Sequence, residues 1–352
     1  MTDTAHPGAL PRVGLIGCGG IAQVHAAVLS SLKDRVQFVA ACDPVAERRQ
    51  AMASQYGLAV YASPEEMLAA ERLDTVHLCT PHDLHVPQAL MALEHGLNVL
   101  SEKPVGISRG QLSALKQGIE KSCKRYGVCL QNRYLPAIRR AQELLSQNAI
   151  GTVLGSRANV SWKRGGAYYG ESPWRGTWLH EGGSAMINQA IHTLDLQCLL
   201  CGHPTQMTGT MHNMSLTGQT EAEDSCQIRM VFESGAIGLF NASIGYGLDA
   251  PVLIEINGDK GALRLEADRL YVRYGEEAWR EEAMPVLPIP GKVYWGSGHL
   301  LLITDYYRTL AEGTPFPIGF KEGTKALMPL LRLYEYWRDR LGEKLPEIDT
   351  EC

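Results

Sequence analysis

A glutamate, a lysine and a proline follow one another at the end of a short apolar run. The stretch is LNVLSEKPVG, in which Glu102, Lys103 and Pro104 come shortly after LNVL. A parallel strand that is buried on both faces is nearly all apolar, so a charged pair at its carboxyl end breaks the local pattern. Such breaks are often functional, although a solvated surface turn would contain the same residues.

A lysine in such a position exchanges a proton with a bound molecule when its ammonium form is disfavoured. The ordinary lysine pKa of about 10.4 falls when burial or a nearby positive charge destabilises the ammonium. A pKa lower by roughly 2 to 3 would let Lys103 accept a proton near neutral pH. Glu102 would oppose this change if its carboxylate pointed inward.

A second pattern lies in the stretch GLIGCGGIAQVH. Gly17, Gly19 and Ala22 form G-x-G-x-x-A after a predicted strand and at the start of a predicted helix. The first glycine permits a tight turn, the second lets the backbone approach a pyrophosphate, and the alanine is small enough for close helix packing. We therefore expect a dinucleotide site with contacts from Gly17, Gly19, Gly20, Ile21 and Ala22.

An acidic residue stands where a dinucleotide's ribose should be bound. Asp43 ends the next apolar run, VQFVAACD, about 21 residues after Ala22. Its carboxylate should accept hydrogen bonds from both ribose hydroxyls and repel a 2′-phosphate, which favours NAD over NADP. Arg48 and Arg49 on the following helix would suit such a phosphate, but a solvated helix face explains them too.

The elements that must position these residues change in character near residue 130. Before it, runs such as RVGLIG and TVHLCTP alternate with helical patterns, which predicts a parallel sheet with crossover helices. After one bridging helix, segments such as SCQIRMVFES and VLIEING predict a mostly antiparallel, half-exposed sheet. The expected fold class is α/β, with a doubly wound Rossmann domain over 1–130 and an α+β substrate domain over 131–352.

Composition excludes several classes of function. The 352 residues are 45% hydrophobic and carry a net charge of −5 without an evident basic patch, which argues against nucleic-acid and anionic-membrane partners. No stretch resembles a membrane span, and the start, MTDTAHPGALPR, lacks an apolar signal core, so we expect a cytoplasmic protein.

The nine cysteines should be reduced and packed. Cys198 and Cys201 form a C-x-x-C near His203, but without a second ligand pair packing is favoured, and no metal is predicted.

Three motifs in order resemble one oxidoreductase family. They are GLIGCGGIAQVH, CTPHDLHVPQALMALEHGLNVLSEKP and EGGSAMINQAIHTLD, and together they are similar to the Gfo/Idh/MocA proteins, named after glucose-fructose oxidoreductase, inositol dehydrogenase and rhizopine catabolism. The resemblance implies a Rossmann domain followed by a domain with a large open sheet, through which such proteins form homodimers or homotetramers. It also implies oxidation or reduction of a sugar or inositol hydroxyl with NAD(H) or NADP(H).

The resemblance assigns roles to the residues around the opening lysine. Glu102-Lys103-Pro104 matches the family's E-K-P motif, so Lys103 would be the catalytic or substrate-positioning lysine. It places Thr80, Pro81 and His85 along the cofactor groove, with Glu102 and Lys103 beside them. For His85, a structural hydrogen bond at the start of a helix is the alternative.

The third motif departs from the commonest family pattern. Inositol-dehydrogenase-like members have an aspartate four residues before the histidine, whereas here Asn188 stands four before His192. The two share one helix face, and Asn188 can orient a substrate hydroxyl but cannot take its proton. This favours relatives that act on glycosides or nucleotide-linked hexoses. Asp195 would bond to the His192 ring or serve the helix alone.

Removing hydride from a carbinol carbon requires a base that takes the hydroxyl proton. Lys103 is expected in that role, and His192, with an ordinary pKa of about 6.5, is the rival base or holds a hydroxyl. A loop rich in aromatic residues and arginine, WKRGGAYYGESPWRGTW, suits sugar binding through Tyr168 and Arg175, although a packed Ω-loop explains the same composition. His299 in YWGSGH is a further substrate candidate.

The sequence therefore predicts an NAD(H)-dependent oxidoreductase of carbohydrate metabolism. It would transfer hydride to or from a secondary hydroxyl or keto carbon of a sugar, glycoside, sugar nucleotide or cyclitol. Two alternatives stay open: an enzyme with tightly bound cofactor that oxidises a sugar transiently to allow elimination or isomerisation, and a non-catalytic NAD-binding sensor. The substrate, the ring position and the direction of the reaction stay open as well.

Overall fold

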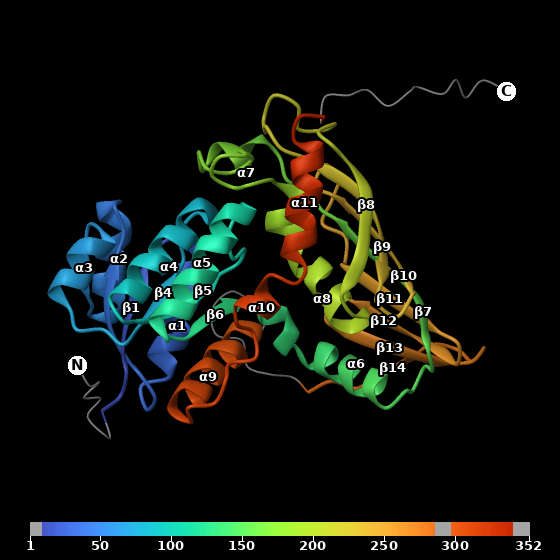
Figure 1. Ribbon diagram of the computed structural model, residues 1–352, viewed down its shortest axis with the longest axis horizontal. Coiled ribbons are helices and arrows are strands. Elements are labelled where there is room, and N and C mark those ends of the chain that lie inside the picture. Colours follow the sequence, from blue (N-terminus) through green and yellow to red (C-terminus); the bar gives the residue numbers. More distant parts are fainter. Residues whose placement is uncertain (1–8, 286–296, 341–352) are drawn as a thin grey trace. The chain divides into compact units, whose positions relative to one another are not determined.

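The computed structural model describes residues 9–285 and 297–340 and divides into two compact units (Figure 1). Unit 1 consists of Met1–Arg139 together with Met284–Thr324, and unit 2 of Arg140–Ala283 together with Lys325–Cys352. No helix within the described ranges has both the length and the apolar character needed to cross a bilayer.

Unit 1 is built on a six-stranded sheet in the order β3-β2-β1-β4-β5-β6. The strands are β1 (Arg12–Ile16), β2 (Gln37–Cys42), β3 (Ala59–Tyr61), β4 (Thr75–Leu78), β5 (Asn98–Glu102) and β6 (Tyr126–Cys129). Every neighbouring pair is parallel. The strand order reverses between β1 and β4, and in such sheets ligands bind at the carboxyl ends beside this reversal. This arrangement confirms the predicted Rossmann sheet.

The helices of unit 1 begin with different caps. The helices are α1 (Gly20–Ser31), α2 (Ala46–Tyr56), α3 (Pro64–Ala70), α4 (His85–Glu94), α5 (Arg109–Ser122), α9 (Gly298–Ala311) and α10 (Phe320–Gly323), with short 3-10 turns η1 (His82–Leu84) and η2 (Gln131–Tyr134). Ser63 and Ser108 cap α3 and α5 through their hydroxyl oxygens. At α1 the cap residue is Gly19, which has no side chain to occupy the first amides.

Unit 2 contains an eight-stranded sheet in the order β14-β13-β12-β11-β7-β10-β9-β8. The strands are β7 (Val153–Ser161), β8 (Pro204–His212), β9 (Ser225–Phe232), β10 (Ile237–Ser243), β11 (Leu253–Gly258), β12 (Gly261–Glu266), β13 (Arg269–Tyr274) and β14 (Arg280–Glu281). Only β7 and β10 pair in parallel, so the predicted mostly antiparallel sheet is confirmed.

Helices cover one face of this sheet (Figure 1). They include α8 (Ile191–Cys201) and α11 (Leu327–Trp337), while α6 (Pro136–Ser146), α7 (Gly166–Gly170) and the π-helix η3 (Ala185–Ala190) complete the described helical segments. The alternating burial along β9 fits a sheet with one covered face. Leu154 and Leu239 remain 59% and 50% exposed. The expected homo-oligomer through this sheet stays a prediction.

Candidate functional site

The glycine turn after β1 is held tightly against the loop after β4. Gly17 has a φ of +90°, and a Cβ atom there would lie 2.7 Å from the carbonyl oxygen of Cys79. A side chain is therefore excluded both by the backbone conformation and by the close approach. The Gly17 amide donates to the Cys42 carbonyl at 2.9 Å, which ties the turn to the end of β2.

The next two glycines border open space. Apart from adjoining residues and the helix's own backbone, no heavy atom of the described chain lies within 4 Å of the positions that Cβ atoms of Gly19 and Gly20 would occupy. These residues form the start of α1, whose first amides have no side-chain cap and whose dipole favours an anion. Ile21 is partly buried, and Ala22 is fully buried in the core beneath the helix. The turn therefore fits a pyrophosphate group, as its sequence predicts.

Asp43 stands directly after β2 and is only 5% exposed. Its Oδ2 accepts the Cys18 amide at 2.8 Å and its Oδ1 accepts the Val45 amide at 2.9 Å. Each carboxylate oxygen has a second lone pair that is able to accept from a hydroxyl. Arg49 donates instead to the carbonyl oxygens of Asp43 and Pro44, so its guanidinium is held by its own loop.

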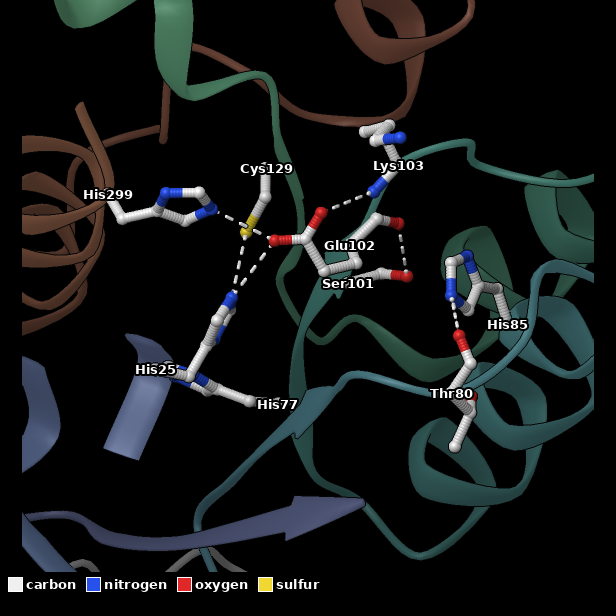
Figure 2. Close-up of polar contacts among 9 residues, drawn as sticks. All are labelled: His25, His77, Thr80, His85, Ser101, Glu102, Lys103, Cys129 and His299. Carbon is white, nitrogen blue, oxygen red and sulfur yellow. Dashed lines mark hydrogen bonds and ion pairs between the residues drawn. The ribbon is translucent and has the colours of Figure 1, made fainter. Parts of the chain in front are cut away.

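Thr80 and His85 lie in the connection between β4 and α4. Both nitrogens of the His85 ring face carbonyl oxygens. Nδ1 lies 2.8 Å from that of Pro104, and Nε2 lies 2.9 Å from that of Thr80 (Figure 2). The Thr80 hydroxyl donates to Gln88 at 2.6 Å, and Pro81 precedes the η1 turn. His85 therefore joins the loops that follow β4 and β5, which is the structural role that the sequence left as an alternative. Burial lowers the pKa of His85.

Glu102 is buried at the end of β5 and lies among histidines (Figure 2). Its Oε1 is 3.1 Å from Nε2 of His25 and 3.1 Å from Nε2 of His299. Its Oε2 accepts the amide of Lys103 at 3.2 Å. His299 is 1% exposed. Lys103, in contrast, is partly exposed, and the peptide bond that joins it to Pro104 is cis. The carboxylate thus points inward from the strand end that carries the lysine.

In unit 2, a π-helix carries Asn188, and π-helical turns occur frequently at functional sites. The Asn188 amide nitrogen donates to Oε1 of Glu181, which is 1% exposed and also accepts the amide of Gly176. His192 follows as the second residue of α8 and is partly exposed. Asp195, one turn later, is buried. A carboxylate thus lies beside Asn188 even though the family's usual aspartate is missing.

Tyr168 contacts the predicted substrate residues of unit 2. Its hydroxyl accepts from Gln189 at 2.7 Å and from Asn188 at 3.4 Å. The Arg175 guanidinium carbon lies 4.1 Å from the centre of the Tyr168 ring, and Arg175 also donates to the Tyr168 carbonyl at 2.9 Å. Tyr168, Arg175 and Asn188 therefore form one connected group, which presents hydroxyl, guanidinium and amide groups suited to a polyol.

Glu223 anchors the start of the π-helix. It is fully buried and accepts the amides of Ser184 and Met186 and the hydroxyl of Tyr334. Burial raises the pKa of Glu223 to about 7, although these hydrogen bonds favour its ionised form. The segment that carries Asn188 is therefore fixed by a titratable buried group.

Residues 11–130 match the family described as "Oxidoreductase family, NAD-binding Rossmann fold" (GFO_IDH_MocA), and residues 138–264 match the "GFO/IDH/MocA C-terminal domain". The chain belongs to the Gfo/Idh/MocA family. The resemblance expected from the three motifs is confirmed, and so is the NAD-binding Rossmann domain. Membership in an oxidoreductase family also agrees with the predicted enzyme class.

Curated Gfo/Idh/MocA relatives include sugar dehydrogenases. The D-glucoside 3-dehydrogenase of Escherichia coli K12 is 26% identical over 281 residues, which are 74% of this chain and 78% of the relative. The D-apiose dehydrogenase of Paraburkholderia graminis is 29% identical over 266 residues, 72% of this chain and 67% of the relative. Among solved structures, the WlbA dehydrogenase of Bordetella pertussis, in complex with NADH and UDP-GlcNAcA, has a TM-score of 0.84 and 28% identity over 94% of this chain and 96% of that chain.

Sequence reasoning missed several buried residues of this Gfo/Idh/MocA chain. His25 contacts Glu102, His77 contacts His25, and Tyr307 contacts His77, while Sγ of Cys129 is 3.9 Å from Nε2 of His25. The signal was available, because His25 and His77 interrupt apolar runs just as Glu102 does. Within the described residues, ligand atoms of His25, Glu102 and Cys129 lie within 4.8 Å of one another, whereas neither Cys198 nor Cys201 belongs to such a group.

Proposed function

We propose that this protein is an NAD(H)-dependent oxidoreductase acting on a secondary hydroxyl or keto carbon of a sugar, glycoside, sugar nucleotide or cyclitol. The observation that carries the proposal is the open glycine turn at α1, next to a buried aspartate at the end of β2. Family membership supports the same chemistry, and the printed activities of the dehydrogenase relatives support a sugar-type substrate.

The cofactor would be held by unit 1. Gly19 and Gly20 leave room for a pyrophosphate on the first amides of α1, and Asp43 would accept the ribose hydroxyls. Because a carboxylate repels a 2′-phosphate and Arg49 is held by backbone carbonyls, NAD is preferred to NADP. Bound NAD⁺ supplies the acceptor for the substrate hydride.

Lys103 would exchange the hydroxyl proton of the substrate. In oxidation, the carbinol carbon loses a hydride to the cofactor while its hydroxyl loses a proton to the neutral amine of Lys103; in reduction, the ammonium returns it. Asn188 and His192 would bind and orient substrate hydroxyls, and Tyr168 and Arg175 would contact the ring or its substituents. The connected hydrogen bonds at Tyr168 support this grouping in unit 2.

Replacing Lys103 by methionine tests the proposal. Methionine keeps roughly the side-chain length and removes the amine, so turnover should fall by about a hundredfold or more while NAD affinity and thermal stability stay near those of the unchanged protein. Lys116→Met is the matched control, because Lys116 lies on α5 with its side chain 62% exposed. Its kinetics should be unchanged.

The assay measures kcat and KM with NAD on a panel of glucosides, apiose, inositols and uridine-diphospho sugars. A higher KM at nearly intact kcat would make Lys103 a binding residue, and wild-type turnover in a folded, cofactor-bound Lys103→Met protein would refute its role as the base. Sugar conversion without net NADH formation would indicate the transient-oxidation alternative. Binding of NAD with no conversion of any member of the panel would favour a sensor.

A further inference from the structure

Four buried side chains are connected to the carboxylate of Glu102 in one hydrogen-bond network, two of them directly and two through His25. The hydroxyl of Tyr307 lies 2.8 Å from Nε2 of His77, and Nδ1 of His77 lies 2.8 Å from Nδ1 of His25. Nε2 of His25 and Nε2 of His299 each lie 3.1 Å from Oε1 of Glu102 (Figure 2). None of the five residues is more than 5% exposed. We call them the Glu102 network.

The ionised state of Glu102 determines where the nearest ring hydrogens lie. Burial raises the pKa of this carboxyl, but hydrogen bonds from His25 and His299 outweigh burial and hold the pKa of Glu102 well below its usual range. An ionised carboxylate accepts hydrogen bonds and donates none. Nε2 of His25 and Nε2 of His299 therefore each carry a hydrogen and donate it to Oε1.

The remaining hydrogen bonds of the network follow from the neutral states of the His25 and His77 rings. Burial lowers the pKa of His25, so its ring is neutral near pH 7 and its Nδ1 accepts a hydrogen from Nδ1 of His77. Burial lowers the pKa of His77 even further below its usual range, so its Nε2 accepts from the hydroxyl of Tyr307. The series from Tyr307 through His77 and His25 therefore runs in one direction, toward Glu102.

Glu102 connects this arrangement to Lys103, whose amide donates to Oε2 at 3.2 Å. We propose that the Glu102 network is a positioning device, which fixes the end of β5 from which Lys103 projects and keeps a negative charge one residue away from it. This inference rests on the proposed function, in which Lys103 exchanges the substrate proton. The histidines and the tyrosine of the network act through Glu102 and are positioning residues.

The network resists rotation of the carboxylate, because any turn of Glu102 breaks its bonds to two histidines and to the Lys103 amide together. Its charge has a second effect, since a nearby anion favours the protonated form of an amine. Removing one donor raises the pKa of Glu102, because one hydrogen bond fewer then offsets the burial of its charge. Where Glu102 takes up a proton, the anion beside Lys103 is lost and Lys103 gives up its proton at a lower pH.

Other titratable groups also face Glu102. They are the thiol of Cys79 after β4, the thiol of Cys129 at the end of β6 and the ring of His85 on α4. Burial holds the pKa of both thiols well above their usual range, so they stay neutral between pH 6 and 9. Glu102 is therefore ionised in this cluster, while the two thiols that face it are neutral.

A bound divalent metal is the competing explanation for the cluster. His25, Glu102 and Cys129 have the residue types of a zinc site, and their ligand atoms lie within 4.8 Å of one another. A metal on Nε2 of His25 would replace the hydrogen that the network requires there. The location of that hydrogen therefore separates the two explanations.

Ring nitrogen NMR of the full-length protein, labelled with ¹⁵N-histidine, measures these hydrogens without an activity assay. We expect Nε2–H at His25 and His299 and Nδ1–H at His77, each assigned with the corresponding histidine variant. Nε2–H at His77, or a stoichiometric metal that is lost in Cys129→Ser, would overturn the proposal.

Kinetics test the connection to Lys103. His299→Leu removes one donor to Glu102, whereas His299→Gln keeps an N–H near the position of Nε2. In the direction of oxidation, we expect His299→Leu to lower kcat about tenfold and to move the rising limb of its pH profile to lower pH, with KM for NAD unchanged. His299→Gln should restore both, and His95→Leu, at an exposed histidine after α4, should change neither.

A purely structural His299 would lower thermal stability in both variants without moving the pH limb, and that result would overturn the proposal. It would leave the proposed function intact as long as Lys103→Met still abolishes turnover. If Lys103→Met retains wild-type turnover, the proposed function fails and the claim that the network positions a catalytic lysine fails with it. The NMR measurement then still establishes whether the hydrogens of the Glu102 network lie on the nitrogens given above.

Discussion

Replacing Glu223 by glutamine is expected to make unit 2 less sensitive to pH. Glu223 is fully buried, and its Oε1 accepts the Tyr334 hydroxyl at 2.6 Å and the Met186 amide at 2.9 Å. The amide of Ser184 lies 3.2 Å from Oε2 and 3.3 Å from Oε1. A glutamine whose oxygen takes the place of Oε1 still accepts from Tyr334 and Met186 and lies within reach of the Ser184 amide, and it removes the titrating charge.

The magnitude follows from the pKa of Glu223, which burial raises from 4.5 to about 7. Between these two pH values the folded protein retains a proton that the unfolded chain has lost, so stability falls as pH rises through this window and is level above it. At about 1.4 kcal/mol for each pKa unit, the loss amounts to about 3 kcal/mol by pH 8. Tyr334, Cys226 and Tyr169, the other titratable groups that face Glu223, have pKa values raised by burial and stay neutral in this window.

Urea unfolding followed by tryptophan fluorescence is the assay. Five of the six tryptophans lie in unit 2: Trp162, Trp174, Trp178, Trp279 and Trp337. Trp178 stacks edge-on against Tyr334 with the ring centres 5.2 Å apart, so it reports directly on the surroundings of Glu223. The stability of Glu223→Gln relative to the unchanged protein should rise by about 3 kcal/mol from pH 4.5 to pH 8.

Glu233→Gln is the control, because Glu233 is an exposed carboxylate after β9. Its stability relative to the unchanged protein should show no comparable trend across the pH series. A pH-independent difference for Glu223→Gln would mean that hydrogen bonds offset the burial of the charge. A difference of the opposite sign would refute the reasoning, since Glu223 would then be stabilised as an anion.

Two further predictions concern the cofactor turn. Gly17→Ala should lower stability by about 1–3 kcal/mol, measured by thermal unfolding, because its backbone has a φ of +90° and its Cβ would lie 2.7 Å from the Cys79 carbonyl. Gly19→Ala should leave the melting temperature unchanged and weaken NAD binding by tenfold or more in calorimetry; unchanged affinity would place the pyrophosphate elsewhere. NAD should bind at least tenfold more tightly than NADP, equivalent to about 1.4 kcal/mol, because of Asp43; tighter binding of NADP would contradict this.

Local sequence patterns predict the fold class because both sheets have clear signals. Buried parallel strands appear as apolar runs followed by helical periodicity, and the half-exposed strands of unit 2 alternate along their length. The placement of α9 has no such signal. Its buried face shows that Gly298–Ala311 packs against something, but periodicity does not identify which sheet, and by its contacts the helix belongs with unit 1.

The Glu102 network illustrates the same limit at the site. The pattern break at Glu102 and Lys103 is visible in the sequence, and His77 breaks the run TVHLCTP in the same way. Pairing them requires long-range information, since His25 and Glu102 are 77 positions apart and His77 and Tyr307 are 230 apart. A single histidine in an apolar run therefore marks a buried polar site but does not name its partner.

Asn188 shows how a missing carboxylate is supplied from elsewhere in the chain. With asparagine in place of the family's usual aspartate, the sequence indicates that no carboxylate stands beside His192. In the structure, the Asn188 amide nitrogen donates to Oε1 of Glu181. The orientation of the amide is thereby determined, and its oxygen is directed away from Glu181. An amide oxygen accepts a hydrogen bond from a hydroxyl but cannot remove its proton, so Asn188 does not replace the missing aspartate as a base.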